Sequence, residues 1–279
     1  MSEELDRASE RALRREVVEV CRLMHARNLV AATDGNVSVR WGEAYLITTP
    51  SGLRKGLLKR KDLIVTDMTG DLAPEEVAPR NGRSPSSELR LHLEIYRQRP
   101  DVRAVVHAHP PITTALTVAG VSLAACVLPE TLITLGTILT TEYATPSSEQ
   151  GPVVVRELIR EHDALVLDRH GAVTVGKSPL DAYGKMEKVE HTAFVILAAR
   201  SLGRIKTLPL EEVRRLSAIR DAWLGPDRKY EGPNCDLCGA CEGLSGSGRG
   251  AVSETGNKPE VDEVVRLVTS EVLSRLGRS

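Results

Sequence analysis

The stretch Ala104-Val105-Val106-His107-Ala108-His109-Pro110 decides how the rest of the sequence is interpreted. Its apolar run predicts a short buried strand that ends at a proline, which cannot donate a hydrogen bond to a sheet. Side chains alternate between the two faces of a strand, so His107 and His109 are expected on the same face, next to a loop. Two imidazoles placed in this way can share a divalent metal ion. Taken alone, the pair fits two structural histidines held by hydrogen bonds equally well.

The composition of the 279-residue chain excludes several classes of protein. The net charge is −1 and the basic residues are dispersed, and one Phe, two Trp and five Tyr offer few rings for base stacking, which argues against a nucleic-acid partner. No apolar run is long enough to cross a membrane, and the charged N-terminus lacks the apolar core of a signal peptide. The five cysteines are an odd number, with three close together near the C-terminus, unlike a secreted disulfide framework. We therefore expect a cytoplasmic protein with reduced thiols.

The residues on either side of the histidine stretch predict helices and strands in succession. Apolar side chains recur at helical spacing over residues 5–28, and closely spaced strands with turn residues between them follow, which predicts an antiparallel sheet. The segment Pro85-Ser86-Ser87-Glu88 predicts the start of a helix over residues 89–97, with Ser86 or Ser87 as its N-cap. The other predicted elements are strands at 37–40, 44–49, 63–67, 124–127, 164–167 and 172–175, and helices at 112–118, from Pro146 to 159 and at 179–199.

A third histidine, His170, follows the predicted strand at 164–167 and precedes a glycine. With His107 and His109 it would supply three nitrogen ligands and leave one position on the metal open, as in catalytic rather than structural zinc sites. Glu88 could add a carboxylate as ligand, base or both, although a capped helix is the simpler explanation of that segment taken alone. The remaining histidines have no partner pattern and are interpreted as structural or surface residues: His25, His92, His162 and His191.

Three loops rich in small residues could bind an anion: Gly35-Asn36, Ser51-Gly52 and Ser86-Ser87. Glycine lets the backbone approach a ligand closely, and the last pair precedes a helix, whose free N–H groups and dipole favour a phosphate. None of these loops is decisive by itself.

In this order along the chain, the motifs resemble those of the class II aldolase/adducin family over about residues 10–220. The resemblance is strongest to the members that cleave L-fuculose 1-phosphate. It rests on Gly35-Asn36-Val37-Ser38, Thr49-Pro50-Ser51-Gly52, Ser86-Ser87-Glu88, His107-Ala108-His109, Leu132-Ile133-Thr134-Leu135-Gly136, Tyr143-Ala144-Thr145-Pro146 and His170-Gly171.

The resemblance implies an α/β fold with α/β/α layers around a mainly antiparallel sheet, usually assembled as a homotetramer with the site near a subunit boundary. It makes His107, His109 and His170 the ligands of Zn²⁺, for which Mn²⁺ or Co²⁺ could substitute. Glu88 becomes the catalytic acid/base, near or on the resting metal. The implied activity is cleavage of a ketose 1-phosphate, L-fuculose or L-rhamnulose 1-phosphate, to dihydroxyacetone phosphate and lactaldehyde. The residues that would hold the substrate phosphate are Gly35, Asn36, Ser51, Gly52, Ser86 and Ser87.

One departure from the family pattern concerns a tyrosine. In the fuculose phosphate aldolases a tyrosine of the neighbouring subunit protonates the aldehyde oxygen, but here Leu128 or a close neighbour stands at that position. A second family tyrosine is matched to Tyr230. Two alternatives share the fold: a sugar-phosphate 4-epimerase, which usually has Asp where Glu88 stands, and a non-catalytic adducin-like binding module, which lacks the metal histidines.

The C-terminal part of the sequence differs in composition from the rest, so we divide the chain into a catalytic domain (1–229), a cysteine cluster with a flexible Gly/Ser-rich linker (230–258) and a terminal helix (259–279). Cys235, Cys238 and Cys241 could bind zinc or an iron–sulfur cluster, remain free thiols, or form a site completed by another chain, since no fourth ligand is evident. Residues 259–279 have the apolar spacing of an amphipathic helix, which is marginal alone. This tail resembles the peptides that encapsulate bacterial microcompartment enzymes, which implies a shell protein as partner. The alternative is a helix that packs on its own domain or mediates oligomer contacts.

Overall fold

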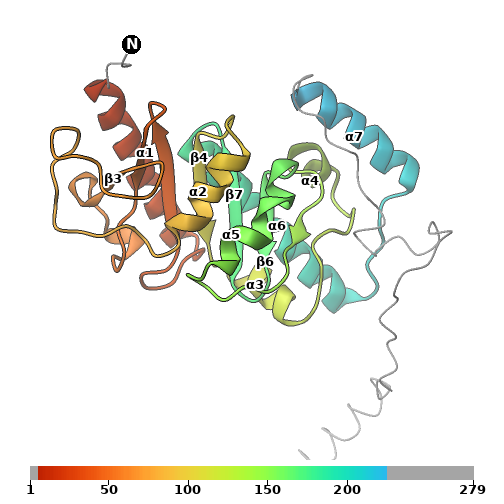
Figure 1. The fold of residues 1–279 in the computed structure, drawn as a ribbon. Coiled ribbons are helices and arrows are strands. Elements are labelled where there is room, and N and C mark those ends of the chain that lie inside the picture. Colours follow the sequence, from red (N-terminus) through yellow and green to blue (C-terminus); the bar gives the residue numbers. More distant parts are fainter. Residues whose placement is uncertain (1–5, 225–279) are drawn as a thin grey trace, which may run out of the picture. The chain divides into compact units, whose positions relative to one another are not determined.

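A single sheet of seven strands forms the centre of the computed structural model, which describes residues 6–224 (Figure 1). These residues lie within the first of two compact units, residues 1–243. The strand order is β3-β2-β1-β4-β7-β6-β5, and every neighbouring pair is antiparallel except β5 with β6. The strands are β1 (Asn36–Trp41), β2 (Tyr45–Thr48), β3 (Ile64–Asp67), β4 (Ala104–Ala108), β5 (Leu139–Thr140), β6 (Ala164–Leu167) and β7 (Gly171–Gly176).

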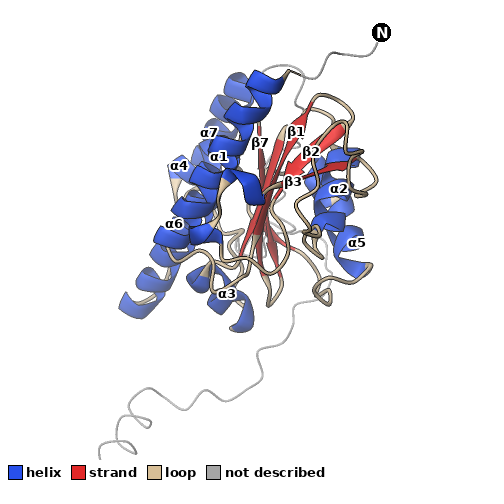
Figure 2. Cartoon of the chain, turned by 90° about the vertical axis from the view of Figure 1, so that its left-hand side faces the viewer, coloured by secondary structure: helices blue, strands red, loops and turns tan. Residues whose placement is uncertain are grey.

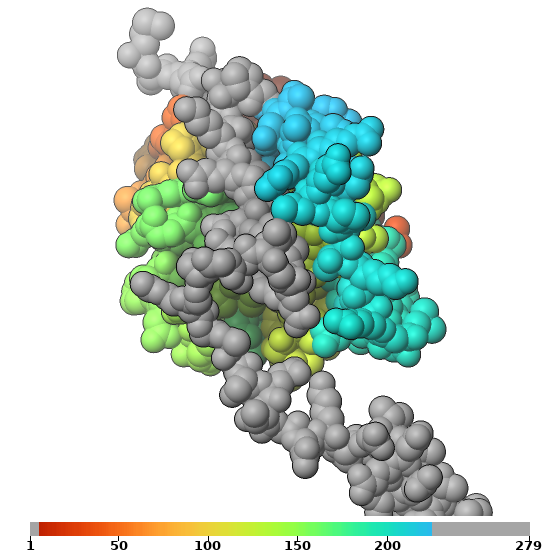
Figure 3. Space-filling view, turned by 90° about the vertical axis from the view of Figure 1, so that its right-hand side faces the viewer, coloured from red at the N-terminus to blue at the C-terminus, as the bar shows by residue number. Residues whose placement is uncertain are grey.

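Helices cover both faces of this sheet, which confirms the predicted α/β/α layers. Figure 2 shows α1, α3, α4, α6 and α7 on one side of the sheet, and α2 and α5 on the other. Helix α7 packs on α4 and forms part of the surface shown in Figure 3. The helices are α1 (Arg7–Ala26), α2 (Leu89–Gln98), α3 (Pro111–Val118), α4 (Pro129–Thr134), α5 (Gln150–Arg156), α6 (Pro179–Leu202) and α7 (Leu210–Leu224). Within the described residues, no helix has the length and apolar composition needed to cross a bilayer.

Strand β4 contributes to two hydrophobic cores because its side chains alternate between the faces of the sheet. Ala104, Val106 and Ala108 belong to the core that packs against α1 and α6. Val105 belongs to the second core, which contains the apolar side chains of α2. His107, two residues after Val105, therefore lies on the face covered by α2, where it is 1% exposed. The alternation predicted for the histidine stretch is confirmed.

Several predicted elements differ from the structure. The predicted strand at 124–127 is wrong: this segment has no partner in the sheet, and Cys126 is instead buried against α4 and α7. The predicted helix after Pro146 is shorter, since α5 is followed by a separate 3₁₀ turn at Leu158–Arg160. The short β5, α4 and α7 were not predicted. Tyr230, the cysteine cluster (Cys235, Cys238, Cys241), the linker and the helix at 259–279 lie outside the described residues and stay predictions.

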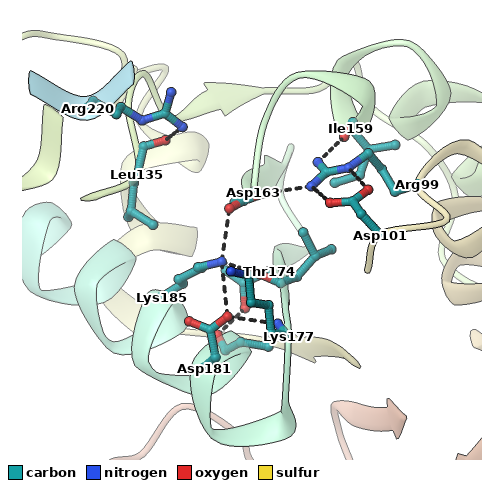
Figure 4. A network of polar contacts seen from close by, with 12 residues as sticks. Arg99, Asp101, Leu135, Ile159, Asp163, Thr174, Lys177, Asp181, Lys185 and Arg220 are labelled. Atoms are coloured by element: carbon teal, nitrogen blue, oxygen red, sulfur yellow. Dashed lines mark hydrogen bonds and ion pairs between the residues drawn. The ribbon is translucent and has the colours of Figure 1, made fainter. Parts of the chain in front are cut away.

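A buried aspartate joins the end of β6 to α6 and to the segment after α2. Asp163 Oδ1 lies 3.2 Å from Arg99 Nη2, and its Oδ2 lies 2.9 Å from Lys185 Nζ (Figure 4). Asp101 also pairs with Arg99, at 2.7 Å, and Asp181 lies 3.5 Å from Lys185 Nζ. Each cation therefore has two carboxylate neighbours, which offset the cost of burying these charges.

Strand β7 makes a close contact with the end of β4 at its first residue, Gly171. A Cβ atom built on Gly171 would lie 2.2 Å from the carbonyl oxygen of Ala108 and 2.9 Å from Cδ2 of His109. The first of these atoms belongs to the backbone and cannot turn away as a side chain could. Gly184, on the exposed side of α6, offers a contrast, because its Cβ would meet no atom within 4 Å.

We predict that Gly171→Ala lowers the free energy of unfolding by about 1–3 kcal/mol or more, since the methyl group must displace a backbone segment. Gly184→Ala is the control: an added methyl in an exposed helix position should raise stability by about 0.5–1 kcal/mol. Urea denaturation of the two variants and the wild type measures both effects. Equal stabilities of Gly171→Ala and the wild type would contradict the prediction.

A buried polar cluster under α2 contains a histidine that is not one of the proposed metal ligands. The Ser38 hydroxyl lies 2.7 Å from Nδ1 of His92 and 2.9 Å from the hydroxyl of Tyr96. His92 is fully buried, and its Nε2 has no hydrogen-bond partner among the described residues. Burial, and next the charge of His107, lower the pKa of His92 from 6.5 to about 3.

This pKa predicts that stability falls on acidification. Between about pH 6.5 and 3 the unfolded chain binds a proton at His92 that the folded chain does not, so the free energy of unfolding decreases as the pH falls through this window. From about pH 7.5 to 4.5, wild-type stability should fall by about 2–3 kcal/mol more than that of His92→Asn, which keeps a polar atom near Ser38 but does not titrate. Urea denaturation at the two pH values tests this, and parallel losses in both proteins would contradict it.

Candidate active site

Four side chains from separate parts of the chain converge on one point at the end of β4. His107 is on β4, His109 follows it, His170 lies in the turn between β6 and β7, and Glu88 immediately precedes α2. One ligand atom of each lies within 4.8 Å of those of the others. The three ring centroids form a nearly equilateral triangle with sides of 4.9, 4.8 and 4.7 Å. The structure thus brings together all four residues that the sequence analysis proposed as metal ligands.

The distances between the ligand atoms fit a metal ion. His107 Nε2 lies 3.1 Å from His109 Nε2 and 3.1 Å from Glu88 Oε2, and His170 Nε2 lies 3.2 Å from Glu88 Oε1. Ligand atoms about 2.0–2.1 Å from a tetrahedral zinc ion would be about 3.3 Å apart, close to these values. Three imidazoles and a carboxylate are also a donor set that suits zinc and neighbouring transition metals. The residues present therefore fit the metal that the family resemblance implies.

Contacts outside this group hold two of the rings in a metal-binding orientation. Nδ1 of His107 donates a hydrogen bond to the carbonyl oxygen of Ala172, 2.9 Å away, which leaves the Nε2 lone pair free for a metal. Nδ1 of His109 lies 3.4 Å from a carboxylate oxygen of Asp34. Burial, and then the charges of His107 and His170, lower the pKa of His109 from 6.5 to about 4. His109 is thus neutral at physiological pH, the form that binds metals.

A tight turn places His170. Leu167 pairs with Gly171, so only three residues, 168–170, connect β6 to β7. Arg169, at the centre of this turn, has a φ of +55°, in the left-handed region that a three-residue hairpin loop commonly uses. The backbone N–H of His170 donates to the carbonyl oxygen of Leu167, which closes the turn. His170 is therefore held at a fixed position beside the other two rings.

Glu88 occupies the N-cap position of α2, where the sequence analysis predicted Ser86 or Ser87. That prediction is wrong, since the cap residue is Glu88 and makes no side-chain cap hydrogen bond. Its carboxylate faces the histidines, and Asn36 Nδ2 donates to Glu88 Oε2 over 3.3 Å. Burial would raise the pKa of Glu88, but hydrogen bonds and charges from His107 and His170 hold it well below its usual range. Glu88 is thus a carboxylate, able to bind a metal or accept a proton.

A cavity of about 250 Å³ adjoins this group. All six residues proposed for phosphate binding line it: Gly35, Asn36, Ser51, Gly52, Ser86 and Ser87. Gly35 has a φ of +71°, and a Cβ there would lie 2.8 Å from the carbonyl oxygen of His107, so the site requires glycine at this position. Asn36 opens β1 opposite His107, and its Nδ2 also donates to Ser86 Oγ over 3.2 Å. The cavity walls and the histidine cluster are thus parts of one site.

The sequence analysis missed two charged residues that line the same cavity, Asp34 and Lys55. Asp34 directly precedes Gly35-Asn36, and its carboxylate approaches His109. Lys55 lies three residues after Ser51-Gly52, and a lysine so close to a predicted phosphate-binding loop could have been proposed from the sequence. Its burial, however, depends on the tertiary structure. Both residues add charge to a cavity that is also lined by small polar side chains and by Glu88, His109 and His170.

Other proteins are similar to this chain in sequence and in fold. The family described as "Class II Aldolase and Adducin N-terminal domain" matches residues 15–197. L-fuculose phosphate aldolase of Methanococcus maripaludis is 34% identical over 178 residues, which are 64% of this chain and 92% of that protein. Methylthioribulose-1-phosphate dehydratase of Methylococcus capsulatus is 34% identical over 187 residues, 63% of this chain and 88% of that protein.

Among solved structures, L-fuculose-1-phosphate aldolase from Thermus thermophilus matches with a TM-score of 0.58 and 31% identity, over 70% of this chain and 98% of that one. The family match covers more than half of the 279 residues and includes Glu88 and all three clustered histidines. The chain therefore belongs to the class II aldolase and adducin family.

Proposed function

We propose that this chain is a metal-dependent aldolase that cleaves a ketose 1-phosphate, L-fuculose or L-rhamnulose 1-phosphate, to dihydroxyacetone phosphate and lactaldehyde. The observation that carries the proposal is the cluster of Glu88 and three imidazoles next to a cavity that small polar residues line, with Glu88, His109 and His170 at its wall. One wall supplies ligands for a cation, and the other supplies hydroxyl groups for an anion. A phosphorylated substrate that develops negative charge during reaction needs both.

The residues would act as follows. His107, His109 and His170 would hold Zn²⁺, or Mn²⁺ or Co²⁺ in its place, and Glu88 lies close enough to join them. The bound ion would supply Lewis-acid stabilisation of the negative charge that develops when the C3–C4 bond breaks. The carboxylate of Glu88 would move the proton at C3. The substrate phosphate would lie against Gly35, Asn36, Ser51, Gly52, Ser86 and Ser87, which line the cavity.

The alternatives have less support from the site. An adducin-like binding module would not need three imidazoles converging on one point, as they do here. A sugar-phosphate 4-epimerase usually has Asp at the position of Glu88. The similarity to a methylthioribulose-1-phosphate dehydratase shows that dehydration has to be distinguished from cleavage by experiment.

We predict that the purified protein releases dihydroxyacetone phosphate from L-fuculose or L-rhamnulose 1-phosphate, loses this activity on chelation and regains it with Zn²⁺. His170→Ala should lower kcat by about 100-fold or more, since the charge stabilisation that the metal supplies is worth several kcal/mol. His191→Ala, at an exposed position on α6, is the matched control and should retain full activity. Chromatography identifies the product: an epimer or a dehydrated ketose in place of the triose phosphate, or full turnover by His170→Ala, would contradict the aldolase.

We also propose that the enzyme is a cytoplasmic homotetramer delivered to a microcompartment by residues 259–279. The reason is chemical, because lactaldehyde is reactive and confinement would protect the cell. A fluorescent protein fused to residues 259–279 should form puncta in cells that make the matching shell and stay diffuse in cells without it. Diffuse fluorescence under both conditions would contradict delivery by this segment.

A further inference from the structure

Lys55 places a positive charge at the cavity in a nearly inaccessible position. It begins the short 3₁₀ helix Lys55–Leu57 and is 1% exposed, yet it lines the same cavity as Ser51 and Ser86. Fully buried lysines are rare unless their charge is paired. The partners of this side chain therefore indicate its role.

The ammonium group of Lys55 has backbone partners and no acidic one. Nζ donates to the carbonyl oxygens of Thr33, at 2.6 Å, and Leu53, at 3.0 Å. An ammonium has three N–H groups, so one remains for another acceptor. Among residues 6–224, no carboxylate forms an ion pair with Lys55, whereas Lys185 has Asp163 at 2.9 Å. The charge of Lys55 is thus buried without a carboxylate in direct ion-pair contact, and Asp34 and Glu88 act on it only at longer range.

The two carbonyl groups belong to the loops that carry Gly35 and Gly52. Lys55 Nζ therefore ties these loops together at the wall of the cavity that they share. A role in tying loops alone would not require a charge, and burying a charge without a direct partner is strongly unfavourable. Burial indeed lowers the pKa of Lys55, while the charges of Cys21, Asp34 and Glu88 raise it. An anion bound in the cavity would supply the direct acidic partner that the ammonium of Lys55 lacks.

We propose that the ammonium of Lys55 binds the phosphate group of the substrate and makes the enzyme selective for phosphorylated over unphosphorylated ketoses. This inference rests on the proposed function only in taking the substrate to be a sugar phosphate. Phosphate is a dianion that accepts several hydrogen bonds, and small hydroxyl side chains with one lysine offer both. Lys55 is thereby distinct from Glu88 and the histidines, since it binds and orients the substrate away from the reacting carbons.

The test compares the wild type with Lys55→Met, which keeps the side-chain length and removes the charge. Isothermal titration of the metal-loaded protein with inorganic phosphate should show a Kd about 10–100-fold higher for the variant, as expected for the loss of a hydrogen bond to a charged group. Lys185→Met is the matched control: it removes a largely buried lysine held by Asp163, and the Kd for phosphate should not change. Equal phosphate affinity of Lys55→Met and the wild type would overturn the proposal.

Kinetics separate phosphate recognition from a general structural defect. For the ketose 1-phosphate, Lys55→Met should raise KM by a similar 10–100-fold, about the worth of one charge-assisted hydrogen bond, with a smaller effect on kcat. The kcat/KM for the same ketose without phosphate should stay unchanged. If Lys55 only holds the loops in place, both substrates should lose kcat/KM equally, and the proposal fails.

The outcomes also separate this inference from the proposed function. If phosphate binds and depends on Lys55 but no ketose 1-phosphate is cleaved, the phosphate site stands and the aldolase is wrong. If cleavage occurs and the Kd for phosphate does not depend on Lys55, the aldolase is supported and the phosphate-binding role of Lys55 is wrong. Should Lys55→Met not fold, a crystal structure of the wild type with inorganic phosphate decides the question. A phosphate oxygen about 3 Å from Nζ supports the proposal, and a phosphate bound elsewhere in the cavity refutes it.

Discussion

Strand β4 is hydrogen-bonded on both sides, to β1 along one edge and to β7 along the other, and this pairing determines which residues reach its histidines. The register with β1 places Asn36 opposite His107. Gly35, which precedes Asn36, lies so close to the backbone of His107 that no side chain would fit there. The register with β7 places Ala172 where its carbonyl oxygen accepts a hydrogen bond from His107. A shift of one residue in either pairing would turn His107 into the opposite core, among apolar side chains.

The charges near the end of β4 are arranged in two groups. Glu88 and Asp34 are acidic and contact the imidazoles, whereas Lys55 contacts none of the three clustered histidines and bonds to the backbone of the loops that carry Gly35 and Gly52. A cation among the histidines and an anion near Lys55 would each meet charge of the opposite sign. Such prearranged charge requires little reorganisation when negative charge develops on a substrate, which is the usual source of electrostatic catalysis.

Much of the fold and the four converging residues could be predicted from the sequence, because they follow local rules. Apolar alternation identified β4 and the shared face of His107 and His109, and apolar runs with turn residues identified β6 and β7. His170, after a predicted strand, and Glu88, at a predicted helix start, could be proposed as partners of that pair, and the family resemblance then assigned their roles. Local rules failed where tertiary contacts overrode them. The N-cap of α2 is Glu88, whose carboxylate contacts His107 instead of capping the helix, and helix packing rather than strand pairing buries Cys126.

The route by which the four ligands arrive has a consequence for assembly. His107 and His109 are neighbours in sequence, but Glu88 and His170 reach them only once α2 is docked and the β6–β7 hairpin is paired with β4. Of these four ligands, an unfolded chain would therefore hold only the two imidazoles of His107 and His109 near one another, and only the completed sheet offers the full set. Ion uptake should then favour the native state over partly folded ones, in proportion to the difference in affinity. Metal binding at this site would therefore also stabilise the completed sheet, whose strands come from distant parts of the sequence.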